Sequence, residues 1–230
     1  MEKIVILTGA GISAESGLGT FRDEGGIWTQ YALEDVATPE GFARDPVLVQ
    51  DFYNARRAQA AEAEPNPAHK ALALLEARHK GEVLIVTQNV DGLHEKAGCR
   101  NVLHMHGQLD RALCHGCGHR WDAPLSMTVE DECDSCGARA ARPDVVWFGE
   151  MPYHMDRIDR ALAEADIFAA IGTSGQVYPA AAFGQLAGAY GARTVELNLE
   201  RSAASEDFSE LRHGPASQVV PAWVEEVLRG

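Results

Sequence analysis

Short apolar runs, rich in β-branched residues and ended by glycine, asparagine or threonine, recur along the chain. Continuous apolar runs of this kind are typical of strands that are buried on both faces of a parallel sheet. We therefore expect buried parallel strands at residues 4–7, 83–87, 102–105, 145–147, 167–171 and 194–197.

Stretches with a helical period separate several of these runs. Asn66 is suited to cap a helix that has Pro67 at its first position, and the apolar residues that follow fall on one face. A second helix is expected from Asp156, and an alanine-rich third from Pro179. Strands that alternate with helices predict an α/β fold, namely a Rossmann-like, doubly wound parallel sheet with ligands at the carboxyl ends of its strands.

Two stretches interrupt this alternation. Residues 32–66 look helical and polar and contain no predicted strand, whereas residues 108–142 are rich in cysteine, glycine and charge and show little periodicity. We interpret both as insertions that together form a smaller lobe. The predicted domains are therefore a Rossmann-like one of residues 1–31, 67–107 and 143–230, and a small one that consists of the two insertions.

The composition is that of an ordinary globular protein, with 46% hydrophobic and 23% charged residues. The net charge of -14 opposes binding to nucleic acid or to an anionic membrane, because both require clustered lysine and arginine. Basic segments of other proteins remain suitable partners.

The apolar run after Lys3 is too short for a signal peptide, and no run reaches the length of a membrane span. We therefore expect a protein of the reducing cytoplasm.

A glycine-rich turn follows the first predicted strand. Residues 9–14 read Gly-Ala-Gly-Ile-Ser-Ala and match the G-x-G-x-x-G/A pattern, in which main-chain amides and the start of a helix face a pyrophosphate. The pattern alone is weak, since a tight turn between a strand and a helix has the same composition. Its position between a predicted strand and helix favours nucleotide binding.

The segment after this turn does not fit an ordinary dehydrogenase, which would continue with a helix and a second strand that ends in an acidic residue. Residues 17–26 contain four glycines and predict a long loop instead. Phe21 and Arg22 in that loop are suited to form an aromatic wall and a phosphate contact. This departure weakens a hydride-transfer function.

Four cysteines have the spacing of a metal site. Cys114 and Cys117 form one C-x2-C pair, and Cys133 and Cys136 form another fifteen residues later. This spacing is typical of a tetrahedral zinc site, although two disulfides or four unconnected thiols are the alternatives. Four thiolates leave no open position for water, so we expect one structural zinc ion. The fifth cysteine, Cys99, is predicted to be a buried free thiol.

His115 and His119 lie close to these cysteines in the sequence. We interpret them as surface residues of the same zinc knuckle and not as metal ligands.

Polar residues concentrate after two neighbouring predicted strands. Gln88, Asn89 and Asp91 follow the strand that ends at residue 87, and a His-Gly pair at 106–107 follows the next strand. Such positions belong at the ligand crevice of a doubly wound sheet, where a histidine can act as a base near neutral pH. Any one histidine is more often structural than catalytic. The candidates are His94, His104 and His106, and the strand period puts the last two on one face.

Several segments together resemble the sirtuin family across nearly the whole chain. They are the Gly-Ala-Gly-Ile-Ser turn at 9–13, Thr-Gln-Asn-Val-Asp-Gly-Leu-His at 87–94, His-Gly at 106–107, the cysteine quartet, Val-Trp-Phe-Gly-Glu at 146–150, Gly-Thr-Ser at 172–174 and Asn-Leu-Glu at 198–200. They occur in the order typical of sirtuins, and the combination is specific even though each piece is only suggestive.

This resemblance implies an NAD-dependent protein lysine deacylase. In such enzymes the acyl oxygen of a modified lysine attacks the nicotinamide ribose and expels nicotinamide, a histidine deprotonates a ribose hydroxyl, and O-acyl-ADP-ribose forms. The matching histidine is His106, with Asn89 and Asp91 as further catalytic residues. The partners implied are acylated lysine-containing proteins, and NAD is the co-substrate.

The resemblance also implies the binding residues, which include the loop residues Phe21, Arg22 and Trp28. The implied cofactor-binding residues are Gly9, Ala10, Gly11, Ile12, Ser13, Glu15, Phe21, Arg22, Trp28, Gln88, Asn89, Asp91, Gly172, Thr173, Ser174, Asn198, Leu199, Glu200 and Ala216. The implied substrate-binding residues, which would pair with the substrate backbone as an added strand, are Val145, Val146, Trp147, Phe148, Gly149 and Glu150.

Two features depart from the commonest deacetylase pattern, and the threonine variant among them resembles the class III, desuccinylase-type sirtuins of bacteria. Gly19 and Thr20 stand where many sirtuins have Pro-Asp, and Gln108 follows the His-Gly pair in place of serine. Tyr53 and Arg56 are spaced i, i+3 and share a helix face. A guanidinium beside a phenol is suited to bind a terminal carboxylate, which succinyl, malonyl and glutaryl groups carry and acetyl lacks.

Other interpretations of these residues stay open. Without the resemblance, Arg56 would more often be a solvated or ion-paired surface residue. Bacterial relatives with the Tyr-x-x-Arg pair also remove acetyl groups, so we expect both activities. The alternative functions are an NAD-dependent protein ADP-ribosyltransferase, which would add mass to its substrate, and a zinc-knuckle binding module in which the glycine turn is only structural.

Overall fold

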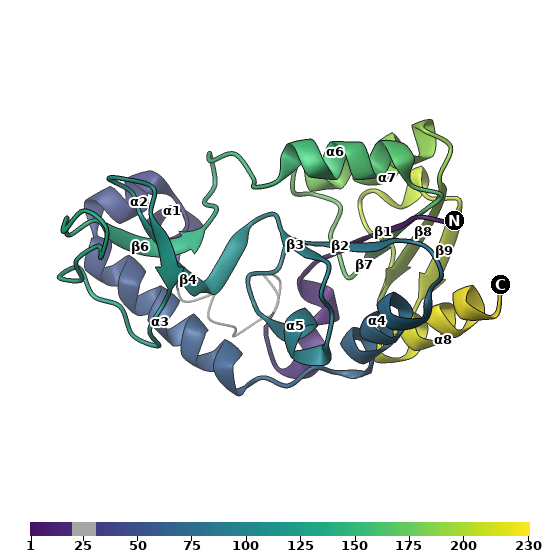
Figure 1. The fold of residues 1–230 in the computed structure, drawn as a ribbon, viewed down its shortest axis with the longest axis horizontal. Coiled ribbons are helices and arrows are strands. Elements are labelled where there is room, and N and C mark those ends of the chain that lie inside the picture. Colours follow the sequence, from purple (N-terminus) through teal and green to yellow (C-terminus); the bar gives the residue numbers. More distant parts are fainter. Residues whose placement is uncertain (20–30) are drawn as a thin grey trace.

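The computed structural model describes residues 1–19 and 31–230 and consists of two lobes. Within the described residues, six strands form a parallel sheet in the order β3-β2-β1-β7-β8-β9, and three form a small sheet in the order β5-β4-β6. The two sheets lie at opposite ends of the long axis (Figure 1). None of the described helices combines the length and apolarity that a membrane span needs.

The large sheet confirms five of the six predicted runs as parallel strands. Its strands are β1 Ile4–Thr8, β2 Val83–Thr87, β3 Val102–His104, β7 Ile167–Ile171, β8 Arg193–Asn198 and β9 Glu210–His213. The pattern did not predict β9, because this edge strand is polar and only partly buried. Strands β1, β2 and β7 are buried along their whole length, which explains their continuous apolar sequence.

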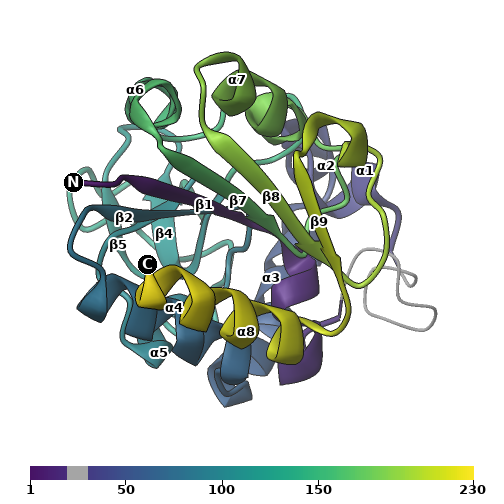
Figure 2. The same ribbon diagram turned by 90° about the vertical axis from the view of Figure 1, so that its right-hand side faces the viewer.

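Helices cover both faces of the large sheet (Figure 2). On one face α4, Pro67–Arg78, packs against α8, Ala216–Arg229, and on the other lie α6, Met155–Glu164, and α7, Phe183–Ala189. Side chains alternate along each strand, so Ile4 and Ile6 join the core beneath α4 and α8. Their neighbours Val5 and Leu7 join the core beneath α6 and α7.

The predicted helix starts are close to those observed. Asn66 caps α4, since its Oδ1 accepts a hydrogen bond from the amide of Ala68 over 2.9 Å, and Pro67 is the first helical residue. Helix α6 begins at Met155, one residue before the expected Asp156. The alanine-rich segment after Pro179 starts as a 3-10 turn and continues as α7.

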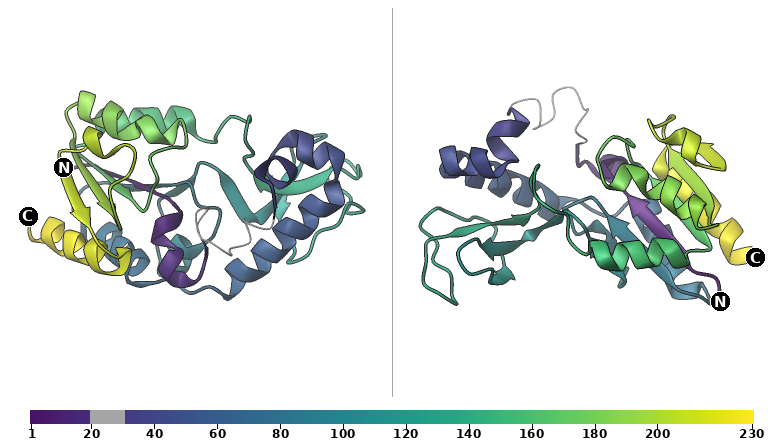
Figure 3. Two further views of the ribbon diagram at one scale, coloured as in Figure 1. Left: turned by 180° about the vertical axis from the view of Figure 1, so that it is seen from behind. Right: turned by 90° about the horizontal axis from the view of Figure 1, so that it is seen from above.

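The small lobe is made of both predicted insertions. Its helices are α1 Leu33–Val36, α2 Pro39–Arg44 and α3 Pro46–Glu62, and its strands are β4 Gly107–Cys114, β5 Arg120–Asp122 and β6 Ala141–Val145. The side-chain amide of Gln50 on α3 donates to the main chain of Ala141 over 2.9 Å, and Phe52 and Tyr53 join a core with Val145 and Trp147. Helix α3 is thereby fixed against the small sheet (Figure 3).

The prediction of a parallel strand at residues 145–147 is wrong. The strand is β6, which ends at Val145 and runs antiparallel to β4 in the small sheet. The hydropathy pattern does not reveal β6, because Arg142 and Asp144 are charged yet buried. Arg142 forms an ion pair with Glu150, and Asp144 forms one with Arg120. The structure also contains β4 and β5 in the segment that showed little periodicity.

The domain boundaries proposed from the sequence remain a proposal. Residues 143–145 were assigned to the Rossmann-like domain but belong to the small sheet, as does Gly107 at the start of β4. A boundary that follows the two sheets would therefore begin at 107 and end at 145.

Candidate active site

A cavity of about 1070 Å³ lies at the carboxyl ends of the parallel strands. The segments after β1, β2, β7 and β8 line it from the large lobe, and α3 and the residues after β6 line it from the small lobe. This is the position that the doubly wound topology predicts for a ligand. Of the predicted site residues, those that line the cavity are Gly9, Ala10, Gly11, Ser13, Glu15, Tyr53, Arg56, Gln88, Asn89, Asp91, His106, Val145, Val146, Trp147, Phe148, Gly149, Glu150, Gly172, Thr173, Ser174, Asn198, Leu199, Glu200 and Ala216.

The glycine turn packs directly on the turn after β7. A Cβ atom on Gly9 would lie 2.7 Å from the oxygen of Gly172, and one on Gly11 would lie 2.8 Å from its Cα. The amide of Gly11 donates to the oxygen of Gly172 over 2.9 Å. Side chains at these positions would force the two turns apart, so the glycines are needed for the floor of the cavity.

Two details of this turn differ from the prediction. In place of the expected helix, two short 3-10 turns follow, Ala10–Ile12 and Ala14–Ser16. Ile12 was assigned to the cofactor site, but its side chain is fully buried in the core under α4 and α8 and does not line the cavity. Phe21, Arg22 and Trp28 lie outside the described residues.

A set of buried hydrogen bonds joins the segment after β2 to the glycine turn. The side-chain amide of Asn89 donates to the main-chain oxygen of Gly9 over 3.1 Å and to Oγ of Ser13 over 3.2 Å. Ser13 in turn donates to the carboxyl of Asp91 over 3.1 Å, and the amide of Leu93 donates to its other oxygen over 3.1 Å. Burial raises the pKa of Asp91, although both of these hydrogen bonds act against that shift. Asn89 and Asp91 are therefore held rigidly at the cavity wall.

His106 has the geometry of a general base. Its Nδ1 lies 3.1 Å from the main-chain oxygen of Gln88, so Nδ1 donates there and the lone pair of Nε2 is left for chemistry. Burial lowers the pKa of His106 below its ordinary value, although the hydrogen bond to Gln88 acts against this. The ring is neutral near pH 7. Gly107 follows with φ 79°, and a Cβ atom there would lie 2.0 Å from the oxygen of Asp144, so the turn requires glycine.

The other two candidate histidines have structural partners. Nε2 of His94 lies 3.0 Å from the hydroxyl of Thr8, and its side chain is fully buried. Nε2 of His104 lies 2.8 Å from the carboxyl of Glu95. Neither residue lines the cavity.

The prediction that His104 and His106 lie on the same face of one strand is wrong. Strand β3 ends at His104, so His106 does not share its face but follows the turn into β4. Burial lowers the pKa of His104, but the hydrogen bond and charge of Glu95 outweigh this, and the pKa is raised overall. Among the three candidates, the geometry selects His106.

The far end of the cavity, beside β8, presents amides and hydroxyls. The side-chain nitrogen of Asn198 donates to the oxygen of Thr173 over 2.7 Å and to the carboxyl of Glu196 over 3.1 Å. Its side-chain oxygen is thereby turned away from these partners. Glu196 is buried and also accepts the hydroxyl of Ser205.

Glu15 has a role that its sequence position did not predict. Its carboxyl accepts the amide of Ser217 over 2.8 Å and the hydroxyl of Ser217 over 2.6 Å, in the first turn of α8. A carboxylate at this position satisfies helix amides and interacts favourably with the helix dipole. Glu15 therefore links the glycine turn to the start of α8, next to Ala216 in the cavity wall.

Tyr53 and Arg56 lie on α3 at the small-lobe end of the cavity, and both line it. Tyr53 is 1% exposed, and its hydroxyl accepts a hydrogen bond from Nε1 of Trp147 over 2.9 Å. The guanidinium of Arg56 lies 6.0 Å from the ring centre of Phe52. Burial lowers the pKa of Arg56, and the nearby Tyr53 and Asp91 act against this. Arg56 therefore faces the cavity, unlike the solvated surface arginine that was the alternative.

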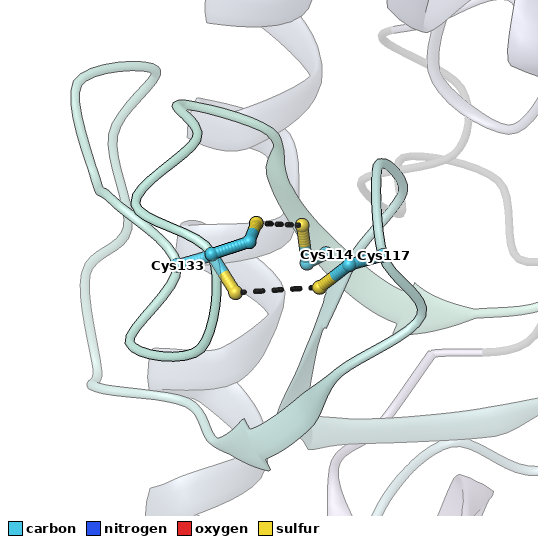
Figure 4. A group of neighbouring side chains, drawn as sticks. Cys114, Cys117 and Cys133 are labelled. Carbon is cyan, nitrogen blue, oxygen red and sulfur yellow. Dashed lines mark hydrogen bonds between the residues drawn. The ribbon is translucent and has the colours of Figure 1, made fainter.

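The four predicted metal ligands converge in the small lobe. The sulfurs of Cys114, Cys117, Cys133 and Cys136 all lie within 4.8 Å of one another. Figure 4 shows Cys114 and Cys117 facing Cys133, and two sulfur pairs are 3.7 Å apart. A tetrahedron with zinc–sulfur bonds of about 2.3 Å has sulfurs roughly 3.8 Å apart, so the quartet fits zinc. These distances are too long for disulfides.

The remaining cysteine and histidines behave as expected. Cys99 is buried, and burial raises the pKa of its thiol to about 12. His115 is exposed, and His119 stacks on Trp121 at 5.7 Å. In the part of the chain that the structure describes, the quartet is the one group of this kind suited to a metal.

Several residues that line the cavity had no signal in the sequence. They are Leu18, Gln59, Pro152, Gln176, Val177, Tyr178, Gly214 and Pro215. All lie in loops or on helix faces without a recognisable motif, so only the tertiary structure brings them to the cavity.

Comparison with known proteins gives a consistent result. The family model described as "Sir2 family" matches residues 9–179. An NAD-dependent protein deacylase of Caulobacter vibrioides is 58% identical over 230 residues, which cover 98% of this chain and 97% of that protein. An NAD-dependent protein deacylase of Escherichia coli is 57% identical over 235 residues, which cover 100% of this chain and 84% of that protein.

Solved structures resemble this one over almost the whole chain. A Sir2 homologue in complex with NAD has a TM-score of 0.90 at 38% identity and covers 99% of this chain and 90% of that chain. A Sir2 homologue bound to a myristoylated histone peptide has a TM-score of 0.75 at 35% identity and covers 99% of this chain and 91% of that chain. The predicted fold class is confirmed.

Proposed function

The chain belongs to the Sir2 family, and we propose that it is an NAD-dependent protein lysine deacylase that removes succinyl, malonyl or glutaryl groups as well as acetyl. The first half of this proposal follows from the names of its close relatives, which are NAD-dependent protein deacylases. The second half, the acyl groups, rests on the residues at the small-lobe end of the cavity.

One observation carries the proposal. A neutral imidazole on one side of the cavity, His106, and a phenol beside a guanidinium on α3, Tyr53 and Arg56, line the same space. The imidazole supplies a base, and the pair on α3 supplies a proton donor and a positive charge for a terminal carboxylate.

The large-lobe side of the cavity fits NAD. The close-packed turns at Gly9 and Gly172 leave main-chain groups without side chains at the floor, as a pyrophosphate requires. The Asn198 side-chain oxygen and the hydroxyls of Thr173 and Ser174 are suited to the adenosine half. When bound, NAD supplies the reactive ribose carbon and nicotinamide as the leaving group.

Each residue then has a defined task. Asn89 and Asp91, held by Ser13, orient the ribose and nicotinamide, while Nε2 of His106 accepts the proton of a ribose hydroxyl. The acyl oxygen displaces nicotinamide, the acyl group passes to the ribose, and one water is consumed. The products are free lysine, nicotinamide and O-acyl-ADP-ribose.

Zinc has no place in this chemistry. The cysteine quartet would hold one ion with all four positions filled, so the metal would stabilise the small lobe without binding substrate. Residues 145–150 line the cavity between the lobes, and we propose that the substrate backbone pairs with them as an added strand.

The test is an incubation of the protein with NAD and peptides that carry succinyl-lysine or acetyl-lysine. Release of nicotinamide and formation of the matching O-acyl-ADP-ribose, followed by mass spectrometry, are expected with both peptides. Turnover of neither peptide would overturn the proposal. A gain in the mass of the peptide, in place of loss of the acyl group, would instead identify an ADP-ribosyltransferase.

A further inference from the structure

A partly buried ion pair joins β6 to Glu150 in the cavity wall. The guanidinium of Arg142 on β6 donates to both carboxyl oxygens of Glu150, over 2.7 and 2.9 Å, and also to the main-chain oxygen of Val145 over 2.8 Å. Arg142 is only 6% exposed. A bidentate arginine–carboxylate pair of this kind has one strongly preferred geometry, so it fixes the conformation of the segment between Val145 and Glu150.

This ion pair holds Trp147 on two sides. The guanidinium of Arg142 lies 3.5 Å from the centre of the indole ring, and the carboxyl of Glu150 accepts the main-chain amide of Trp147 over 2.8 Å. The ring centres of Phe42 and Trp147 lie 5.2 Å apart. Cation–π contact, a backbone hydrogen bond and aromatic packing together leave the indole a single orientation.

In that orientation the indole N–H points at Tyr53. Nε1 of Trp147 donates to the hydroxyl oxygen of Tyr53 over 2.9 Å. An indole nitrogen has no acceptor capacity, so the phenol oxygen is the acceptor of this bond and its own proton must point elsewhere. Within residues 1–19 and 31–230, no acceptor for that proton is found, while Tyr53 lines the cavity. Burial raises the pKa of Tyr53, so the phenol keeps its proton.

We propose that Trp147, held by Arg142 and Glu150, is a positioning residue for acyl specificity that fixes Tyr53 as a hydrogen-bond donor to the terminal carboxylate of the acyl group. The inference rests on the proposed function. It adds the reason why Tyr53, whose phenol can both donate and accept a hydrogen bond, favours a carboxylate, which can only accept one. Trp147 does not touch that carboxylate. It acts through Tyr53, and an acetyl group gains nothing from this arrangement.

The test replaces the indole N–H while keeping an aromatic ring. For the W147F variant we expect the ratio of desuccinylation to deacetylation, each measured as kcat/KM, to fall about fivefold, the effect of one hydrogen bond. The fall should appear in the KM for the succinyl peptide. W121F is the matched control in the small lobe, and we expect this variant to keep the wild-type ratio of desuccinylation to deacetylation.

A double-mutant cycle separates positioning from general damage. Y53F alone should lower the ratio about tenfold, because it removes a donor to a charged group. Adding W147F to Y53F should then lower the ratio no further. A fall of the same size in both backgrounds would overturn the inference, since Trp147 would then act independently of Tyr53.

Two further outcomes complete the test. If W147F does not fold, E150Q weakens the ion pair without touching the indole, and we expect about a threefold fall in the ratio; an unchanged ratio contradicts the inference. If the wild-type protein cleaves the succinyl peptide and W147F keeps the wild-type ratio, the inference alone fails. If the wild-type protein does not cleave it, the proposed acyl specificity itself fails.

Discussion

The main-chain oxygen of Gln88 accepts a hydrogen bond from Nδ1 of His106 over 3.1 Å. Because a carbonyl only accepts, the proton of the neutral ring must be on Nδ1, and Nε2 keeps its lone pair. The turn after β2 therefore sets the tautomer of a residue that follows β3. The direction of this bond decides which nitrogen of His106 is available as a base.

Replacement of His106 by tyrosine should abolish turnover of both the succinyl and the acetyl peptide. Tyrosine cannot accept a proton at neutral pH, and loss of a general base lowers the rate by about 10²–10⁴-fold. The rate of nicotinamide release measures this, and circular dichroism checks the fold. The exposed His115, replaced in the same way, is the control. Full activity in H106Y would remove His106 from its role.

The pH profile of kcat/KM should have an acid limb with its midpoint below pH 6.5. Burial lowers the pKa of His106, so the ring stays neutral and active down to a lower pH than an ordinary histidine, which titrates near about 6.5. Activity should fall as the pH drops through that lowered pKa. Measurement with the acetyl peptide avoids titration of an acyl carboxylate, and a midpoint above 6.5 would contradict the assignment.

Arg56→Met should reduce desuccinylation far more than deacetylation. The change removes the positive charge that we propose for binding the acyl carboxylate, and a hydrogen bond to a charged group is worth about 10–100-fold in kcat/KM. Arg44→Met, at the exposed ion pair with Asp35, is the matched control and should leave both activities close to wild type. Equal losses with the two peptides would argue against a carboxylate at Arg56.

Acid should destabilise the fold through two buried histidines. Burial lowers the pKa of His69 to about 4 and that of His94 well below its ordinary value, and each has a buried Nδ1 without a partner among the described residues. Between about pH 6.5 and 4 the unfolded chain binds more protons, so stability falls as the pH falls.

For His69 the expected loss is about 3 kcal/mol across that range. Urea unfolding at pH 7, 6, 5 and 4 measures it. His69→Gln should show a shallower pH dependence than the wild type, while its stability at pH 7 reports the loss of packing. An identical slope in the variant would show that His69 does not titrate on unfolding.

Purified protein should contain one zinc ion per chain, detectable by elemental mass spectrometry. Cys133→Ser removes one of four thiolates and should lose the metal and destabilise the small lobe, because structural zinc contributes directly to folding. Cys99→Ser, at the buried thiol outside the quartet, is the control and should retain the metal. Metal-free wild-type protein with an unchanged melting temperature would contradict the zinc assignment.

Local features of the chain were enough to predict much of the fold. The buried strands β1, β2 and β7, the cap at Asn66 and the spacing of the cysteine quartet each follow from residues that are close in sequence. The pattern did not predict the edge strand β9, because that strand is polar and only partly buried. It did not predict β6 either, because hydropathy takes no account of charged residues that are buried as ion pairs. Arg142 and Asp144 are such residues.

By itself, then, the sequence determined the fold class, the cysteine quartet and the segments from which the cavity is built. Only the tertiary structure decided that His106 lines the cavity while His94 and His104 bind Thr8 and Glu95. It also decided that Glu15 accepts the amide of Ser217 in α8 and that Trp147 donates to the phenol of Tyr53. The physical reason is the distance along the sequence between the residues that decide each feature. Buried strands and helix faces follow from hydrophobic patterns among neighbouring residues, whereas the direction of a hydrogen bond depends on atoms that packing brings together from distant segments.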